Sequence, residues 1–240
     1  LDALSLEITH GPVTRDGKWP AVAYDGVNIG MSWVSGDTSV RSILFDENLV
    51  VRSEELVYDS KNADVPAQQP RMTATGKGFI TVWEDLAGDP TFFEQEWIRS
   101  AFVSGENELL STSVVQEVGV GSSANWPSPA WAGSHAAVAY YQNRGMKFQL
   151  FFTRMSPEGK RLDGVDFLMT DVEGDVRYPA LVYLGQSDQQ DKYRVAWVDN
   201  HTGQQQVYLR NLVCEPLPAK KVQHKVQIRS IPATSFDWRD

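Results

Sequence analysis

One short signature recurs four times along the chain, a proline followed six residues later by a glycine. The prolines stand at positions 20, 70, 127 and 179, so successive copies are 50, 57 and 52 residues apart. The copies are PAVAYDG, PRMTATG, PSPAWAG and PALVYLG. Self-similarity at a period of roughly 20–50 residues is typical of repeat architectures, in which a small unit buries its apolar face only against its neighbours. The repeat therefore constrains the fold before any other feature is considered.

The first half of each copy predicts two β-strands. Proline suits the start of a strand because no hydrogen-bond donor is needed there, and the glycine opens a turn at positive φ without steric cost. An apolar run such as VNIGMSW or YRVAW follows, which suits a buried strand. Each run ends on an aromatic residue, and the residue two positions further on is polar in every copy. The aromatics are Trp33, Trp83, Tyr140 and Trp197, and their followers are Ser35, Asp85, Gln142 and Asp199.

The second half of each copy predicts two more strands. A strand-like run contains an arginine in every copy, and a turn follows it. The arginines are Arg41, Arg99, Arg154 and Arg210. The fourth strands are LVYDS, TSVVQE, DFLMT and VQIRS. Four antiparallel strands in about 50 residues form one blade of a β-propeller, so we predict an all-β propeller region over residues 1–240.

The repeat frame does not close neatly at the chain ends. The predicted repeats span residues 20–69, 70–126, 127–178 and 179–238, and residues 1–19 supply an extra outer strand of a preceding blade. Three explanations are open: a piece of a larger propeller, one subunit of an assembled propeller, or a small ring closed by exchange of the terminal strand. The frayed register favours the first two. The start of the chain, without a basic segment or an initiating Met, predicts a longer or processed precursor.

The pattern resembles the repeats of bacterial secreted and cell-surface propeller proteins, which combine a Pro-x5-Gly strand, a Trp-x-Asp strand and an Arg strand. The resemblance extends from about Pro20 to Trp238 and departs in the third copy, where Tyr140 and Gln142 replace Trp and Asp. WD-repeat, kelch and sialidase Asp-box signatures are absent. Relatives of this kind are adhesion or binding modules, carbohydrate-binding proteins or domains attached to enzymes. The resemblance therefore implies an extracellular, cell-surface or periplasmic location and no single activity.

Composition excludes several classes of partner and site. The formal net charge of −9 argues against a nucleic-acid partner, since binding phosphates needs clustered Lys and Arg. No apolar run approaches the roughly 18 residues of a membrane-spanning helix. The single cysteine, Cys214, excludes an internal disulfide framework and a multi-cysteine zinc site, and we expect it to be packed rather than reactive.

The aromatic residue just before each repeat proline is the best candidate for a binding position. Trp19, Trp126, Tyr178 and Trp238 occupy it, and Gln69 is the exception. A row of such rings near one rim of the propeller can stack on sugar faces. The alternative is that each ring fills space between adjacent blades.

Catalytic and metal sites are harder to find. A charged pair with an architectural role recurs in two copies, as Asp85 with Arg99 and as Asp199 with Arg210. Because the adjacent Glu84 and Asp85 belong partly to the repeat pattern, we expect this acidic pair to be a poor general acid or base. The loop Asp171–Asp175 is similar to part of a calcium loop but lacks the later bidentate acid. The histidines lack metal-ligand spacing. We predict no catalytic residue, no metal and no cofactor.

These observations favour a non-enzymatic binding or structural module that contacts a glycan or a protein. Its contact loops would be residues 88–96 and the polar insertion 186–192. Two alternatives stay open. One is a propeller-fold carbohydrate-active enzyme, a hydrolase or lyase with its site at the channel mouth. The other is a subunit that closes a propeller or filament with another chain.

Overall fold

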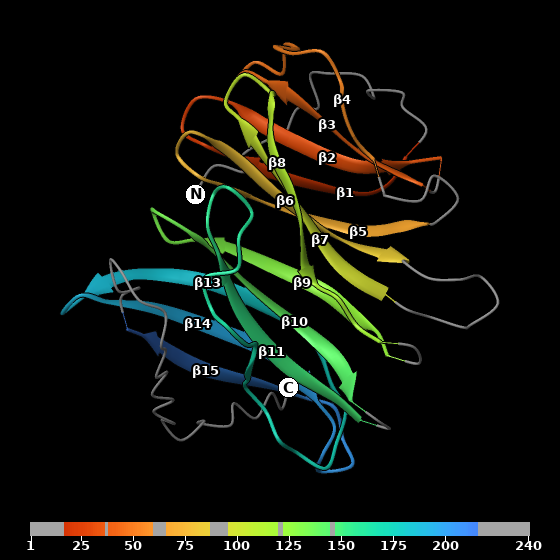
Figure 1. Cartoon of the computed structure of the whole chain (residues 1–240), viewed down its shortest axis with the longest axis vertical. Coiled ribbons are helices and arrows are strands. Elements are labelled where there is room, and N and C mark those ends of the chain that lie inside the picture. The colour runs from red at the N-terminus through yellow and green to blue at the C-terminus, as the bar shows by residue number, and fades with distance from the viewer. Residues whose placement is uncertain are drawn as a thin grey trace, which may run out of the picture.

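The structure is a computed structural model that describes residues 17–36, 38–59, 66–86, 96–119, 122–144 and 147–215. Within these ranges every regular element is a β-strand, and none is a long apolar helix of the kind that crosses a membrane. The strands form four antiparallel sheets, each built from consecutive strands. The sheets follow one another through the molecule in chain order (Figure 1).

We call the sheets blades 1 to 4. Blade 1 comprises β1 (Lys18–Tyr24), β2 (Ile29–Ser35), β3 (Ser39–Phe45) and β4 (Leu56–Asp59). Blade 2 comprises β5 (Ala67–Ala74), β6 (Gly78–Leu86), β7 (Glu96–Ser104) and β8 (Leu109–Gln116). Blade 3 comprises β9 (Ala124–Trp131), β10 (Ala136–Arg144), β11 (Lys147–Met155) and β12 (Phe167–Leu168). Blade 4 comprises β13 (Val176–Ser187), β14 (Gln190–Asp199) and β15 (Gln206–Cys214).

The first strands of the blades lie side by side. β1 contacts β5, β5 contacts β9, and β9 contacts β13. Each blade therefore begins at an inner strand and runs outward through its second and third strands, which is the radial arrangement of a propeller. The predicted all-β propeller class is confirmed. The fourth strand predicted for the last repeat and the extra strand predicted at the start lie outside the described residues.

The start of each inner strand differs from the prediction. The prolines do not open the strands, since β1 begins at Lys18, two residues before Pro20, and the other inner strands also begin ahead of their proline. The residue before the proline has φ between 49° and 56° in all four blades, and the strand register shifts there. Each repeat proline therefore lies at a β-bulge, where its missing N–H does not interrupt the ladder. All four glycines have positive φ, and the predicted turn is confirmed at Gly26, Gly76 and Gly133. In the fourth copy it is wrong, because Gly185 lies at a bulge within β13 and the turn is at Asp188 and Gln189.

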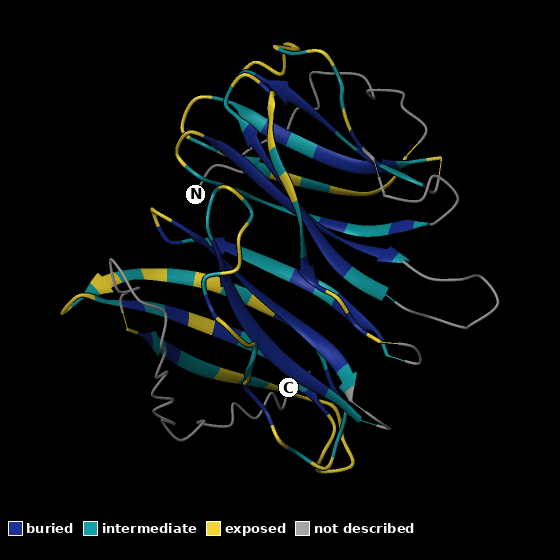
Figure 2. Cartoon of the chain, viewed as in Figure 1, coloured by how far each residue is buried: buried dark blue, intermediate teal, exposed yellow. Residues whose placement is uncertain are grey.

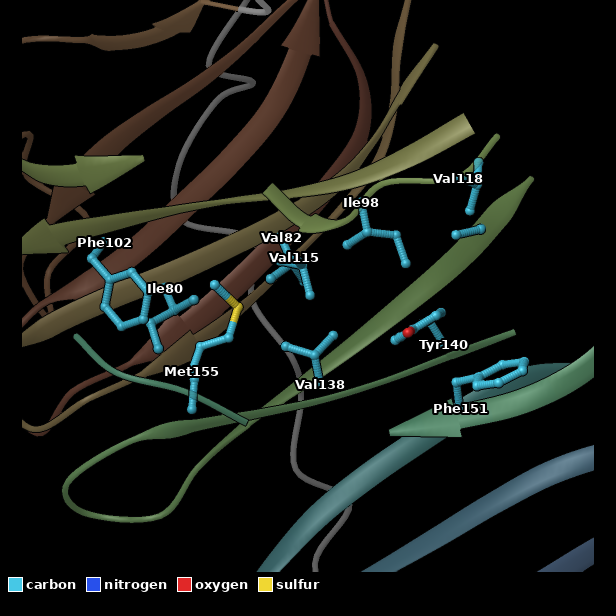
Figure 3. Close-up of a cluster of buried hydrophobic side chains, with 12 residues drawn as sticks. Ile80, Val82, Ile98, Phe102, Val115, Val118, Val138, Tyr140, Phe151 and Met155 are labelled. Atoms are coloured by element: carbon cyan, nitrogen blue, oxygen red, sulfur yellow. The ribbon is translucent and has the colours of Figure 1, made fainter. Parts of the chain in front are cut away.

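The buried strand predicted in each copy is confirmed. Trp33, Trp83, Tyr140 and Trp197 are 4%, 1%, 0% and 7% exposed. One apolar cluster lies between blades 2 and 3, where Ile80, Val82 and Ile98 meet Val138, Tyr140 and Phe151 (Figure 3). A second cluster joins blade 3 to blade 4, and a third joins blade 1 to blade 2. Successive blades thus stack through sheet faces that are apolar.

The arginines lie on the third strand of each blade as predicted, but they are not equivalent. Arg41 and Arg99 pair across the ladder with the buried Trp of their own blade, whereas Arg154 pairs with Ala137 and Arg210 with Val195. The predicted recurring charged pair is therefore wrong for the fourth copy. Arg99 does hold Asp85 at 2.9 Å.

The fourth copy uses different partners. Arg210 donates to the carbonyl of Met169, and Asp199 instead lies 2.9 Å from Nδ1 of His201. Equal order along the sequence therefore does not give equal strand register in the four copies.

Candidate functional site

Three of the predicted aromatics, Trp19, Trp126 and Tyr178, lie at bulges near the starts of the inner strands, and Gln69 occupies the fourth bulge. Trp19 is 40% exposed and Tyr178 is 42% exposed, while Trp126 is half-buried. Trp238 lies outside the described residues. A positive φ at each of these residues turns the chain out of the ladder, so the ring leaves the regular alternation of the strand.

The structure brings two of these aromatics together. The rings of Trp126 and Tyr178 are 4.7 Å apart at 70°, and Tyr178 also meets Tyr141 of β10 at 6.4 Å and 89°. The guanidinium of Arg71, on β5, lies over the ring of Trp126 at 5.3 Å. Trp19 is separate, and its ring contact is with the Lys18 ammonium at 5.9 Å. The predicted row of aromatics is thus a cluster over blades 3 and 4, interrupted by Gln69.

A buried carboxyl group lies beneath this cluster. Glu84, near the end of β6, is 3% exposed, and its Oε1 accepts the backbone N–H of Trp126 at 2.6 Å. That N–H belongs to the bulge, so the carboxyl supplies an acceptor where the ladder is interrupted. Oε2 makes no hydrogen bond within the described part of the chain. One oxygen of Glu84 therefore holds the bulge, and the other has no hydrogen-bond partner among the described residues.

The environment raises the pKa of Glu84 to about 7. Burial is the main cause, because it disfavours the charged form. The negative charge of Glu96 raises the pKa further, while the Trp126 N–H and the Arg71 guanidinium oppose the shift. A carboxyl group with this pKa is about half protonated at neutral pH.

Glu96 is the second carboxylate of the site. It begins β7 and accepts a hydrogen bond from the side-chain amide of Asn125. Glu84 and Glu96 therefore contact consecutive residues, Trp126 and Asn125, at the start of β9. They come from different strands and do not occupy equivalent positions of the repeat.

Phe148 and Arg177 extend the site over blades 3 and 4. Phe148 meets the ring of Tyr141 at 5.3 Å, and the Arg177 guanidinium lies 4.8 Å from the Phe148 ring. Burial, helped by the charge of Glu84, raises the pKa of Tyr141 and keeps its hydroxyl protonated. We call Glu84, Glu96, Trp126, Tyr141 and Tyr178, with the two flanking cations Arg71 and Arg177, the rim site.

The rim site combines the groups that acid–base chemistry on a polar organic substrate requires. A protonated carboxyl can give a proton, a nearby carboxylate can take one, and an exposed aromatic ring can position a sugar. Matched pairs of carboxyl groups whose environments separate their pKa values are typical of such sites.

Sequence reasoning missed Glu84. It treated Glu84 and Asp85 as one acidic pair, but they differ, because Asp85 is held by Arg99 and faces away from the rim site. A comparison of the four copies contains the pattern that could have identified Glu84. Glu84 occupies the position after the buried aromatic, where the other copies have Val34, Tyr141 and Val198. This position is apolar or aromatic in the other three copies, so a carboxyl group there indicates a role outside the repeat pattern.

Of the remaining predicted features, the loop 171–175 borders the rim site, since Asp175 lies 3.4 Å from the Arg177 guanidinium, and the others lie apart from it or outside the described residues. In the loop 171–175, Glu173 pairs with Lys147, and Asp175 accepts the Phe148 N–H at 3.3 Å. No group of three or more His, Cys, Asp or Glu suited to a metal occurs among the residues the structure describes. The insertion 186–192 forms the β13–β14 hairpin. Residues 88–95 of the other contact loop lie outside the described ranges.

Cys214 is packed, as expected. It is 1% exposed, and burial raises the pKa of its thiol to about 12. A thiol with this pKa is protonated at neutral pH, so it is a poor nucleophile.

No protein-family model and no curated protein matches the chain. Solved structures do match in fold. A thermostable family-43 glycoside hydrolase aligns at 7% identity and a TM-score of 0.46, over 90% of this chain and 97% of that one. An exo-1,5-alpha-L-arabinanase from a bovine ruminal metagenomic library aligns at 8% identity and 0.43, over 82% and 71%. A neuraminidase-like protein of a flat-faced bat strain aligns at 7% and 0.41, over 82% and 72%.

These comparisons correct the functional interpretation of the sequence. The three structures named are described as a glycoside hydrolase, an arabinanase and a neuraminidase-like protein, and not as binding or structural modules. The non-enzymatic interpretation is corrected on this comparison. At 7–8% identity the likeness concerns the fold alone, so the activity has to be argued from the rim site.

Proposed function

We propose that the chain is a carbohydrate-active enzyme, a glycoside hydrolase whose active site is the rim site. The observation that carries the proposal is the buried carboxyl of Glu84, whose pKa of about 7 lets it hold a proton at neutral pH. Glu84 is placed beneath the Trp126–Tyr178 pair, with one oxygen fixed by the Trp126 N–H.

In the proposed reaction, Glu84 is the general acid. Its Oε2 gives a proton to the glycosidic oxygen as the bond from that oxygen to the anomeric carbon breaks. In a one-step reaction, water adds to the anomeric carbon and its proton passes to the carboxylate of Glu96. In a two-step reaction, the Glu96 carboxylate first bonds to the anomeric carbon; water then displaces it, and the water proton passes to the carboxylate of Glu84. The proton balance is complete with these two residues and water, so the proposal includes no metal and no cofactor.

Tyr178 is the proposed contact for the sugar ring. It is the exposed member of the aromatic cluster, whereas one face of Trp126 carries the Arg71 guanidinium. The predicted role of Trp126 therefore changes: it supports Tyr178 and donates its backbone N–H to Glu84, and the sugar stacks on Tyr178.

We also propose that the protein acts outside the cytoplasm of a bacterium. The support is the resemblance of its repeats to secreted and cell-surface propellers, together with a polysaccharide as the substrate class. Recovery of the native protein mainly in the cytoplasmic fraction would contradict this part of the proposal and leave the chemistry untouched.

Turnover of a panel of 4-nitrophenyl α- and β-glycosides of pentoses, hexoses and uronic acids tests the function. We expect release of nitrophenol from at least one member. On the methyl glycoside of the same sugar, whose leaving group must be protonated, we expect a loss of about 100- to 10,000-fold in Glu84→Gln. Glu106→Gln is the matched control, because Glu106 is exposed on the β7–β8 turn. Tyr178→Ala should raise KM about tenfold with a smaller effect on kcat. Equal turnover of the methyl glycoside by Glu84→Gln and the wild-type protein would sink the proposal.

A further inference from the structure

Arg71 differs from the other arginines in having no polar partner. Every other arginine side chain that the structure describes donates a hydrogen bond or forms an ion pair. Arg71 does neither with any described residue, and its guanidinium instead lies over the ring of Trp126 at 5.3 Å. A cation–π contact of this kind uses the positive charge and leaves the N–H groups of the guanidinium free to donate.

Arg71 also departs from the repeat, as Glu84 does. The residue after the repeat proline is Ala21, Ser128 or Ala180 in the other blades. In blade 3 this residue connects two blades, because the Ser128 hydroxyl accepts a backbone N–H of β13 at 2.9 Å. Blade 2 therefore has two charged side chains, Arg71 and Glu84, at positions where the other copies have uncharged ones.

The sheet places these two side chains near each other on one face. Arg71 pairs across the ladder with Val82, and Glu84 lies two residues further along β6, so all three point to the same side of blade 2. The positive charge of Arg71 lowers the pKa of Glu84 against the effect of burial. Figure 2 shows β5 as mostly half-buried beside the buried β6, so Arg71 lies at the margin of the core.

The Arg71 guanidinium is suited to bind an anion. Arginine presents its N–H groups in a planar fork that matches the two oxygens of a carboxylate. No carboxylate among the described residues forms an ion pair with Arg71. Arg177, the other cation of the rim site, is already paired with Asp175 at 3.4 Å. Arg71 is therefore the cation of the rim site that remains available to a ligand.

We propose that the substrate is a glycoside of a uronic acid and that Arg71 binds its carboxylate. This inference rests on the proposed function and narrows its substrate class. In a pyranose uronic acid, the carboxylate on C5 and the glycosidic oxygen on C1 flank the ring oxygen, so both lie on one edge of the sugar. A ring on Tyr178 can therefore present the glycosidic oxygen to Glu84 and the carboxylate to Arg71.

The bound carboxylate should also change the proton affinity of Glu84. In the free protein, the charge of Arg71 opposes the raised pKa of Glu84. A substrate carboxylate neutralises that charge, so the pKa of Glu84 should be higher in the complex than in the free protein. The alkaline limb of kcat, which reports the complex, should then lie at higher pH than the limb of kcat/KM. A neutral substrate should give no such separation.

Matched methyl glycosides test this inference. The probes are the α- and β-methyl glycosides of glucuronic and galacturonic acid, each compared with the glucoside or galactoside that has CH2OH in place of the carboxylate. For the wild-type protein, kcat/KM should be about 10- to 100-fold higher for the uronoside, as expected for charge-assisted hydrogen bonds. Arg71→Met should bring the ratio close to one, and Arg71→Lys, which keeps the charge without the fork, should keep part of it.

Arg52→Met is the matched control. It removes the same charge from an arginine that is exposed and paired with Asp46 in blade 1, so the ratio should stay at its wild-type value. The separation between the limbs of kcat and kcat/KM should persist in this control and disappear in Arg71→Met.

Binding separates a failure of this inference from a failure of the proposed function. Calorimetric titration of Glu84→Gln, which turns over methyl glycosides slowly, should show uronosides binding about 10- to 100-fold more tightly than the matched hexosides. Adding Arg71→Met should remove the difference. This binding result without hydrolysis by the wild-type protein would contradict the proposed function alone.

Three outcomes would overturn the inference itself. They are equal binding and hydrolysis of uronosides and hexosides, absence of uronoside binding, and a preference for uronosides that survives in Arg71→Met with native far-UV circular dichroism.

Discussion

At the scale of single residues, Glu84 shows how a repeat acquires a chemical group. Three blades use Val or Tyr at this position, and blade 2 uses a carboxyl that is almost fully buried. Burial would be costly for the ionised form. The protein reduces the cost through the Trp126 N–H and the nearby Arg71 guanidinium, and through a pKa of about 7 that keeps the group partly neutral. The same features suit it to proton donation.

The pKa of Glu84 predicts a pH-dependent stability. Its value in the folded state is about 7 against 4.5 for an ordinary glutamate, so between these values the folded chain binds a proton that the unfolded chain does not. The contribution of Glu84 to stability is therefore present below pH 4.5 and is lost as pH rises through 7, by about 3 kcal/mol in total. Urea unfolding should show wild-type stability falling relative to Glu84→Gln between pH 4.5 and 8. A constant difference across that range would contradict the assignment.

The pKa of His135 predicts a pH dependence of stability opposite to that of Glu84. His135 is 3% exposed, its Nε2 lies 2.9 Å from the Tyr193 hydroxyl, and Asp191 approaches to 3.6 Å. Burial lowers the pKa of His135, opposed by the charge of Asp191, with the buried Arg154–Asp163 pair as further neighbours. Its contribution to stability is thus present above pH 6.5 and is lost as pH falls below that value.

In His135→Gln, the loss of unfolding free energy between pH 7 and pH 5 should be smaller than in the wild-type protein. His201→Gln is the control, because His201 is exposed. Parallel curves for the wild-type protein and His135→Gln would refute the assignment.

At the scale of the elements, a buried ion pair fixes the outer part of blade 3. Arg154 on β11 contacts Asp163, in the segment between β11 and β12, at 2.8 Å, and both side chains are at most 2% exposed. Arg154 also donates to the carbonyl of Glu215 beyond β15. The pair therefore connects blade 3 with the end of blade 4.

Removing one partner of this pair should be costly. Asp163→Asn leaves the Arg154 charge buried without its counter-ion, and we expect a loss of about 3–5 kcal/mol in the free energy of unfolding. Glu173→Gln is the matched control, since the Lys147–Glu173 pair is exposed and should contribute at most about 1 kcal/mol. Equal effects of the two substitutions would show that the buried pair does not stabilise the blade.

The elements were far more predictable than the site. The Pro-x5-Gly repeat placed the strands and the buried aromatics because both depend on local chain chemistry that recurs in each copy. The bulges at Trp19, Gln69, Trp126 and Tyr178 were not foreseen, since a positive φ is uncommon for a non-glycine residue and the residue before a proline favours an extended conformation. Glu84 and Tyr178 come together only through the stacking of blades 2, 3 and 4. No spacing along the chain records that proximity.

At the scale of the whole molecule, stability should be greatest in the two middle blades. Blades 2 and 3 are covered on both faces, and the cluster between them includes residues at 0% exposure from β6, β7, β10 and β11. The terminal inner strands β1 and β13 have exposed residues along one face. Hydrogen exchange should therefore be slowest in β6, β7, β10 and β11 and fastest in β1 and β13. Uniform protection across the four blades would contradict this order.

The central claim is that the rim site hydrolyses glycosides with Glu84 as the acid. The pH dependence of kcat/KM for a methyl glycoside of the sugar that the enzyme accepts tests it most directly, because an alkoxide leaves only with a proton and the general acid must be protonated to give it. The account predicts a fall in kcat/KM above about pH 7 in the wild-type protein, and no such limb in the residual activity of Glu84→Gln. A profile that stays flat through pH 8, or an alkaline limb that persists in Glu84→Gln, would contradict it.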